Sequence, residues 1–419
     1  MTWGDCRVVP SGRRPVPGPR VDSRRRVLRA GRVARCAGGG GRSGLRGGTR
    51  GCCPVGGRRG RCRVGRGCAR GPGGRSRTGC GVGRTGARRP VRLAREGDVV
   101  VVTVSYRLGV LGYLRAPGIS EGNLGLADQL AALRWVRENI SAFGGDPDAV
   151  TVAGQSAGAH TVQCLLGMPD AEGLFRRAVV QSSPAALGLG SARSARKAAD
   201  RFLTRLGADP RTVSVVDVLD AQTALAREAA GRLGLRAVPL FRPVAGVGPL
   251  PDAARWAACL AGGAPGLDVI IGTTGREMSA FYTPGPALRR LRRVPALGSA
   301  TADAVERAAG AAFFDRPARR LAARLSEAGA RVWTYRFDYA APASPFGATH
   351  CIELPFLFGT DADWTAAPML AGADPHDIDT LGRALRTAWL SFIRTGTPST
   401  DTPWPPFTAA APAVHHWRP

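Results

Sequence analysis

Hydrophobic positions predict strands alternating with helices from about residue 92 onward. Residues 99–105 form a β-branched run that is typical of a strand buried on both faces. Residues 128–140 place apolar side chains at helical spacing. Further strands are predicted at 149–153, 178–181, 269–272 and 331–337, and further helices at 157–166, 194–206 and 316–325. This alternation predicts an α/β fold with a mainly parallel central sheet that helices cover on both faces.

The first 91 residues show neither the two-residue period of a strand nor the 3.6-residue period of a helix, so no strand or helix is predicted there. They contain 24 Arg, 24 Gly and seven of the ten Cys, but only two acidic residues and one aromatic residue, Trp3. Such a segment cannot bury enough apolar surface to fold by itself. We therefore expect 1–91 to be disordered and 92–419 to form the domain.

Two interpretations of residues 1–91 stand. An Arg/Gly-rich tail can bind nucleic acid through its charge, but the aromatic side chains that stack on bases are missing. The alternative is that residues 1–91 are translated out of frame. The whole chain has 58 Arg and a single Lys, which indicates a GC-rich gene, and a GC-rich gene read out of frame gives the composition of residues 1–91. We favour out-of-frame translation and expect no specific nucleic-acid partner.

Most of the formal charge of +28 arises in the first 91 residues, because 92–419 carry 35 basic and 29 acidic side chains. No apolar run approaches the roughly 20 residues of a membrane span, and no secretory signal is visible, although one could have been lost with the N-terminus. Three Cys in 92–419 give no disulfide framework. We expect a cytoplasmic protein without a membrane span, and the oligomeric state stays open.

A candidate nucleophile lies where a predicted strand ends and a predicted helix begins. The motif is Gly154-Gln155-Ser156-Ala157-Gly158. A sharp turn there needs small flanking residues and lifts the Ser156 hydroxyl clear of the sheet. The same turn directs the Ala157 N–H at the oxygen of the group that Ser156 attacks. The alternative, a Gly-Ser turn without chemistry, is common for the motif alone but not in this strand–helix context.

From these residues the chain resembles the type-B carboxylesterases, a family with the α/β-hydrolase fold that includes the cholinesterases. The resemblance implies hydrolysis of a small-molecule carboxylic ester through an acyl-enzyme, with neither a metal nor an organic cofactor. It covers nearly all of 92–419, and nothing in 1–91 matches. The matching segments are residues 104–109, 122–129, 143–147, 154–158, 272–281, 350–359 and 404–407.

The serine needs a histidine base, and a carboxylate must orient that histidine. His160 is one turn beyond Ser156 on the same predicted helix, so it points away. His376 lies in an Asp-rich loop, and two further histidines lie in the last five residues. His350 remains, and it also matches the family's catalytic histidine segment.

For the acid, Glu277 follows the buried strand at 269–272, and the order Ser156, Glu277, His350 is that of α/β-hydrolases. The family has an Asp-Glu-Gly type of motif here, from which Arg276-Glu277-Met278 departs while keeping the Glu. Glu353 is the rival acid, although we interpret it as structural. The resemblance also makes Arg107, Asp128 and Asp146 structural and Ser182 a hydrogen-bond partner near the site.

In this family two further oxyanion donors come from a His-Gly-Gly loop ahead of strand 99–105. No His precedes position 160, so this loop is absent as translated. The strand that leads into it belongs between strand 99–105 and the nucleophile strand. We therefore expect the N-terminal strands to be missing, and a gap in the sheet with unpaired backbone groups. Two interpretations follow. The first is a carboxylic ester hydrolase whose activity the missing oxyanion loop would impair. The second is a non-catalytic protein, either the product of a damaged gene or a family member kept for binding alone.

Out-of-frame translation makes a prediction about the gene. If residues 21–27 are read one base later, their codons admit Trp-(Ile/Thr)-His-Gly-Gly, which is the family's oxyanion loop. This reading requires GTG at Val21, TCA at Ser23 and CGG at the next two codons. Sequencing the DNA tests it, and any other codon at Ser23 contradicts it.

Overall fold

The computed structural model describes residues 6–10, 27–30, 91–230, 239–283, 285–295, 297–359, 364 and 366–418. Within them one sheet of eight strands has the order β2-β3-β1-β4-β5-β6-β7-β8. From β4 to β8 every neighbouring pair is parallel. The strands are β1 (Cys6–Pro10), β2 (Val27–Ala30), β3 (Val101–Val104), β4 (Val150–Gln155), β5 (Arg177–Gln181), β6 (Asp268–Thr274), β7 (Arg331–Phe337) and β8 (His415–Trp417).

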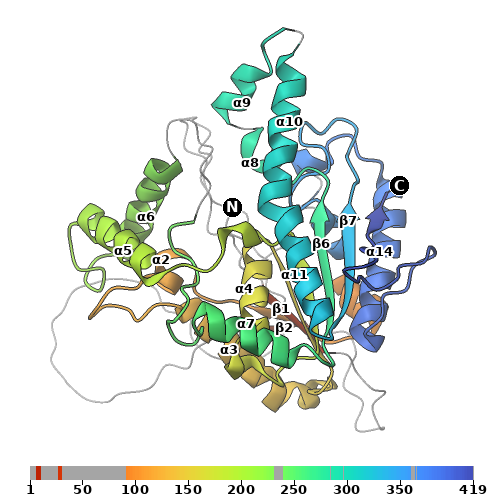
Figure 1. Ribbon diagram of the computed structural model, residues 1–419, viewed down its shortest axis with the longest axis horizontal. Coiled ribbons are helices and arrows are strands. Elements are labelled where there is room, and N and C mark those ends of the chain that lie inside the picture. Colours follow the sequence, from red (N-terminus) through yellow and green to blue (C-terminus); the bar gives the residue numbers. More distant parts are fainter. Residues whose placement is uncertain are drawn as a thin grey trace, which may run out of the picture. The chain divides into compact units, whose positions relative to one another are not determined.

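Helices follow most of these strands and cover the sheet (Figure 1). They are α1 (Val91–Gly97), α2 (Gly109–Tyr113), α3 (Leu124–Asn139), α4 (Ala157–Leu166), α5 (Ala192–Leu206), α6 (Val215–Ala230), α7 (Ala253–Gly263), α8 (Ser279–Tyr282), α9 (Pro286–Leu291), α10 (Gly298–Gly310), α11 (Arg316–Glu327), α12 (Glu353–Phe358) and α14 (Pro375–Thr395). The mainly parallel α/β fold is therefore confirmed. The predicted helix at 157–166 and strand at 331–337 have the observed bounds.

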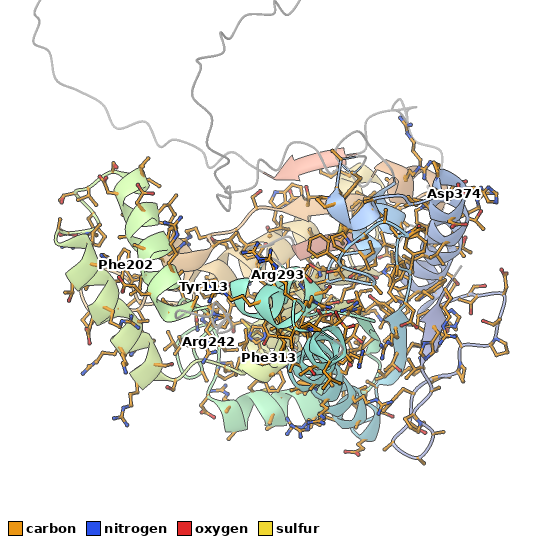
Figure 2. The ribbon with its side chains drawn as sticks, turned by 90° about the horizontal axis from the view of Figure 1, so that it is seen from above. Tyr113, Phe202, Arg242, Arg293, Phe313 and Asp374 are labelled. Carbon is orange, nitrogen blue, oxygen red and sulfur yellow. The ribbon has the colours of Figure 1, made fainter. Side chains whose placement is uncertain are left out.

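Two hydrophobic cores lie on the two faces of the sheet, because successive strand residues point to opposite faces. In β6, Val269 and Ile271 pack with α3, α4, α7 and α11, whereas Ile270 packs with α1, α12 and α14. Figure 2 shows Phe202 of α5, a member of the first core, and Asp374, the N-cap of α14, on opposite sides of the described chain. A strand that is apolar on both faces is what the uninterrupted β-branched runs predict.

The expected gap in the sheet is a prediction that the structure corrects. Strand β1 lies between β3 and β4, antiparallel to both, with Cys6 opposite Gly154 and Pro10 opposite Val150. Strand β2 pairs with the other side of β3. Exposed N–H and C=O groups of β3 and β4 need partners, and backbone pairing does not require a hydrophobic pattern in the partner strand. The rest of 1–91, with its predicted disorder, lies outside the described residues.

Between Pro286 and Gly310 the chain forms α9 and then α10. After α10 the helix continues through one π-helical turn, Ala311–Asp315, into α11. Pro317 explains this turn, because it has no N–H for the ordinary i−4 bond to Phe313. The continuous helical segment thereby carries Phe314 to the carboxyl end of the sheet.

Gly272→Ala should destabilise the protein. A Cβ at Gly272 in β6 would overlap the ring of Tyr335 on the neighbouring strand β7. Such overpacking costs about 1–3 kcal/mol of unfolding free energy. The control is Gly262→Ala in α7, where no atom lies within 4 Å of the added Cβ, so stability should stay equal or rise. Urea denaturation measures both, and equal losses would contradict the argument.

Candidate active site

The backbone at Ser156 forms a strained turn between β4 and α4. Ser156 has φ 56° and ψ −121°, a conformation that costs a non-glycine residue energy. Two hydrogen bonds hold it, from Ser156 N to Gln181 O and from His160 N to Ser156 O, each 2.9 Å. A Cβ on Gly154 would lie 2.7 Å from the Ala159 nitrogen, so only glycine fits there. The turn therefore lifts the serine to the carboxyl edge of the sheet, as the motif predicts.

Ser156, His350 and Glu277 form one chain of hydrogen bonds. Ser156 Oγ lies 2.8 Å from His350 Nε2, and His350 Nδ1 lies 2.5 Å from Glu277 Oε2. Neutral His350 with its proton on Nδ1 donates to the carboxylate and accepts from the serine hydroxyl. His350 and Glu277 are 5% and 2% exposed. The predicted contacts of His350 with both residues are confirmed.

Loops after β6 and β7 position the carboxylate and the imidazole. Glu277 lies in the turn after β6, where its Oε1 accepts a 2.7 Å hydrogen bond from Thr274 N. His350 follows β7, and its ring lies close to two aromatic rings. The ring centroids of Phe281 and Phe314 are 5.4 and 5.3 Å from that of His350. Sequence reasoning missed Phe314, since no spacing relates a helix residue to a histidine in a loop beyond the next strand.

Burial lowers the pKa of His350, but Cys351 and the Glu277 carboxylate raise it, and the resulting pKa is well above the ordinary value. In the buried site the carboxylate of Glu277 therefore favours the imidazolium form. A neighbouring carboxylate stabilises the imidazolium whenever the imidazole takes up a proton.

The other candidate residues lie in different surroundings. Glu353, the rival acid, contacts Gln181 Nε2 at 3.5 Å rather than the imidazole. Its burial, with Glu277 nearby, raises its pKa to about 7. His160 is buried, and burial beside Arg242 lowers its pKa to about 4. His376 is exposed at the start of α14. Among the described residues, neither histidine forms a hydrogen bond to the Ser156 side chain.

The Ala157 N–H is the first of helix α4 and points from the N-terminal end of that helix. The first N–H groups of a helix have no acceptor within the helix, and the helix dipole adds positive potential there. An oxyanion formed beside Ser156 would find this donor. The oxyanion role of Ala157 stays a prediction.

The residues interpreted as structural differ in their contacts. Arg107 Nη2 pairs with Asp128 Oδ1 at 2.6 Å on a partly exposed surface. Asp146 Oδ1 accepts from Asp148 N at 2.9 Å and so caps a turn. Ser182 is fully buried, but its Oγ hydrogen-bonds to no described residue, so the predicted hydrogen bond near the site is not observed.

In the described part of the chain, no helix has the length and hydropathy to cross a bilayer. In the same residues no three His, Cys, Asp or Glu side chains are grouped so that they could hold a metal ion.

The chain is similar to known proteins in sequence and in structure. A sequence model of the Carboxylesterase family matches residues 78–289 and 295–417. A probable N-octanoylanthranilate hydrolase of Rhodococcus erythropolis is 48% identical over 75% of this chain and 69% of its own length. The para-nitrobenzyl esterase of Bacillus subtilis is 36% identical over 75% and 68%. A thermophilic PNB esterase structure superposes with a TM-score of 0.65 at 34% identity, covering 79% of this chain and 74% of that one.

The chain thus belongs to the carboxylesterase family and has its α/β-hydrolase fold. It is an ester hydrolase by family, and the family's substrates are small-molecule esters.

Titration of His350 tests the electrostatics without reference to activity. We expect an NMR titration midpoint above 6.5, the ordinary value. Glu277→Gln should lower the midpoint, because it removes a negative charge that raises the pKa. The pKa of His350 is higher in the folded state than in the unfolded state, so its protonation stabilises the folded protein. This contribution to the free energy of unfolding is full below about pH 6.5 and is lost as the pH rises through the folded-state pKa. As a control, Glu353→Gln should move the midpoint less; a larger shift would make Glu353 the partner.

Proposed function

We propose that this protein hydrolyses small carboxylic esters with Ser156 as nucleophile, His350 as general base and Glu277 as the orienting acid. One observation carries the proposal, the hydrogen-bond chain of 2.8 and 2.5 Å from Ser156 Oγ through the imidazole to the Glu277 carboxylate. A serine hydroxyl becomes an effective nucleophile when an imidazole takes its proton. The carboxylate fixes the tautomer with its proton on Nδ1 and stabilises the imidazolium that forms.

The reaction has two halves. Ser156 Oγ attacks the ester carbonyl carbon while its proton passes to His350 Nε2. The resulting oxyanion accepts a hydrogen bond from the Ala157 N–H. The imidazolium then gives its proton to the leaving alcohol oxygen as the carbon–oxygen bond breaks. In the second half, water gives its proton to His350 and attacks the acyl-enzyme, which releases the acid and restores Ser156.

Oxyanion stabilisation limits the rate that this site can reach. Loss of one donor costs about 10²–10³ in kcat. The chain as translated has no His-Gly-Gly sequence before position 160. We therefore propose Ala157 as the donor that is available and expect slower turnover than from a site with additional donors.

The aromatic side chains beside the imidazole suggest the class of ester. Phe281 and Phe314 flank His350, and Phe314 also belongs to a small apolar cluster with Met278 and Tyr282. Aromatic rings prefer offset or edge-to-face contacts with another ring. Two relatives are named as a para-nitrobenzyl esterase and an N-octanoylanthranilate hydrolase. We propose esters with an aromatic group beside the scissile bond as substrates.

Hydrolysis of p-nitrophenyl butyrate by the full chain tests the proposal. Ser156→Ala or His350→Ala should lower kcat about 10⁴–10⁶-fold, and Glu277→Gln about 10³–10⁴-fold, because the three groups act as a unit. His376→Ala, at an exposed position outside the site, should leave kcat unchanged. Turnover that survives Ser156→Ala would contradict the proposal. No turnover by the wild type would support the non-catalytic alternative.

A further inference from the structure

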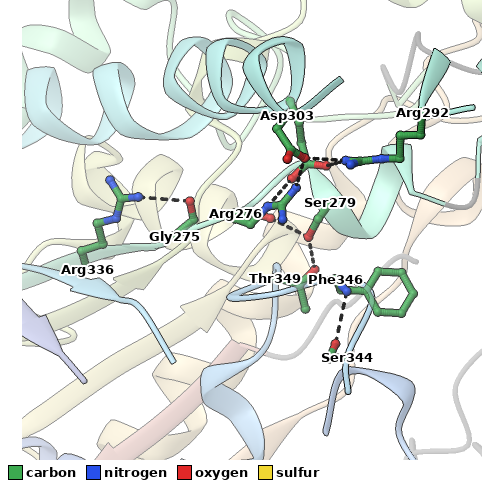
Figure 3. Close-up of polar contacts among 10 residues, drawn as sticks. Gly275, Arg276, Ser279, Arg292, Asp303, Arg336, Ser344, Phe346 and Thr349 are labelled. Atoms are coloured by element: carbon green, nitrogen blue, oxygen red, sulfur yellow. Dashed lines mark hydrogen bonds and ion pairs between the residues drawn. The ribbon is translucent and has the colours of Figure 1, made fainter. Parts of the chain in front are cut away.

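Arg276 ties the loop of the acid to helix α10. It directly precedes Glu277, and its side chain reaches two carboxylates of α10 (Figure 3). Its Nε donates to Glu306 Oε1 at 2.8 Å, and its Nη2 donates to Asp303 Oδ1 at 2.7 Å. The Glu306 side chain is 1% exposed, so its charge depends on cationic partners. Helix α10 and the acid loop are therefore held together by charge-assisted hydrogen bonds.

The backbone of Arg276 also joins the acid loop to the histidine loop. Its N–H donates to Ala348 O at 2.7 Å, and Arg276 forms a parallel bridge with Thr349, the residue before His350. Ser279 Oγ donates to Arg276 O and lies 2.7 Å from Thr349 Oγ1, as Figure 3 shows. A displacement of Arg276 would therefore shift both loops that meet at the imidazole.

The helical segment that begins with α10 also lies close to the imidazole of His350. Beyond α10, the π-helical turn carries Phe314, whose ring centroid is 5.3 Å from that of His350. Glu306 and Phe314 are eight positions apart along this segment. One helical segment thus contacts the loop of Glu277 through ion pairs and contacts His350 through an aromatic ring.

A second arginine provides a contrast within the same charge cluster. Arg292, just after α9, pairs with the same two carboxylates, with Asp303 Oδ1 at 2.8 Å and with Glu306 Oε2 at 3.3 Å. The two arginines are similarly exposed, at 32% and 29% of their side chains. Arg292 belongs to neither the acid loop nor the histidine loop. The two residues therefore share a charge environment and differ in what they anchor.

We propose that Arg276 is a positioning residue, which, by pairing with Glu306 and Asp303 of α10, holds Glu277 and His350 in the alignment that ester hydrolysis requires. This proposal rests on the proposed Ser156–His350–Glu277 function. It also assigns a role to the arginine at which this chain departs from the Asp-Glu-Gly type of motif.

Arg276→Met and Arg292→Met should be compared in the full chain with p-nitrophenyl butyrate. Misplacement of a catalytic group by about 1 Å can cost about 10² in rate. We expect Arg276→Met to lower kcat about 10–100-fold with KM within about threefold, because Arg276 positions groups and does not bind substrate. Arg292→Met should lower thermal stability comparably and leave kcat within about threefold. Arg276→Lys keeps the charge but loses the fork that reaches both carboxylates, so it should recover only part of the lost kcat.

Two measurements keep the test decisive if Arg276→Met does not fold. Glu306→Gln keeps the shape of the side chain and should lower kcat in the same direction, and combined with Arg276→Lys its effect should be less than additive. The NMR midpoint of His350 should move toward its ordinary value in these variants but not in Arg292→Met.

Equal kcat values for Arg276→Met and Arg292→Met, with unchanged His350 midpoints, would overturn the positioning role. If Ser156→Ala abolishes turnover in the same assay, the proposed function stands despite that result. Turnover that survives Ser156→Ala instead overturns the proposed function, and the positioning role with it.

Discussion

The backbone at Ser156 is the constraint on which the rest of the site depends. A serine at φ 56° persists only where its surroundings enforce that conformation. Strand β4 ends directly before it, helix α4 begins directly after it, and Gln181 O accepts from its N–H. Gly154 leaves room for the helix to begin so close to the strand. The same turn fixes the hydroxyl and the Ala157 N–H in one geometry, so nucleophile and oxyanion donor cannot be placed independently.

The parallel sheet brings distant residues to this turn. Gln155 of β4 pairs with Gln181, and Gln181 pairs in turn with Gly272 of β6. Strands β6 and β7 continue in parallel register, so β4, β6 and β7 all end at the same edge. The segments that follow β4, β6 and β7 each supply one group of the proposed triad at this edge. Both faces of the strands are packed, which resists any slip in register.

Charge inside the site is balanced by short-range partners. The Glu277 carboxylate has His350 on one oxygen and the Thr274 N–H on the other. Two aromatic rings lie close to the imidazole, and His350 and Glu277 are both buried, which strengthens the attraction between them. One residue away, two arginines and two carboxylates form a balanced cluster that links the acid loop to α10. Both side-chain packing and ion pairs thus hold the loops around the imidazole in place.

Elimination among the histidines and the family resemblance made His350 and Glu277 candidates. The sequence by itself determined the alternation of strands and helices and the elbow at Ser156. These follow from local rules, because a buried strand needs β-branched residues and a sharp turn needs glycine. Tertiary structure alone decided which partners meet across long separations. Strand β1 pairs between β3 and β4 through backbone groups that any sequence carries, and Phe314 reaches His350 through a π-helical turn. The link from Arg276 to Glu306 likewise depends on how α10 packs, which no periodicity encodes.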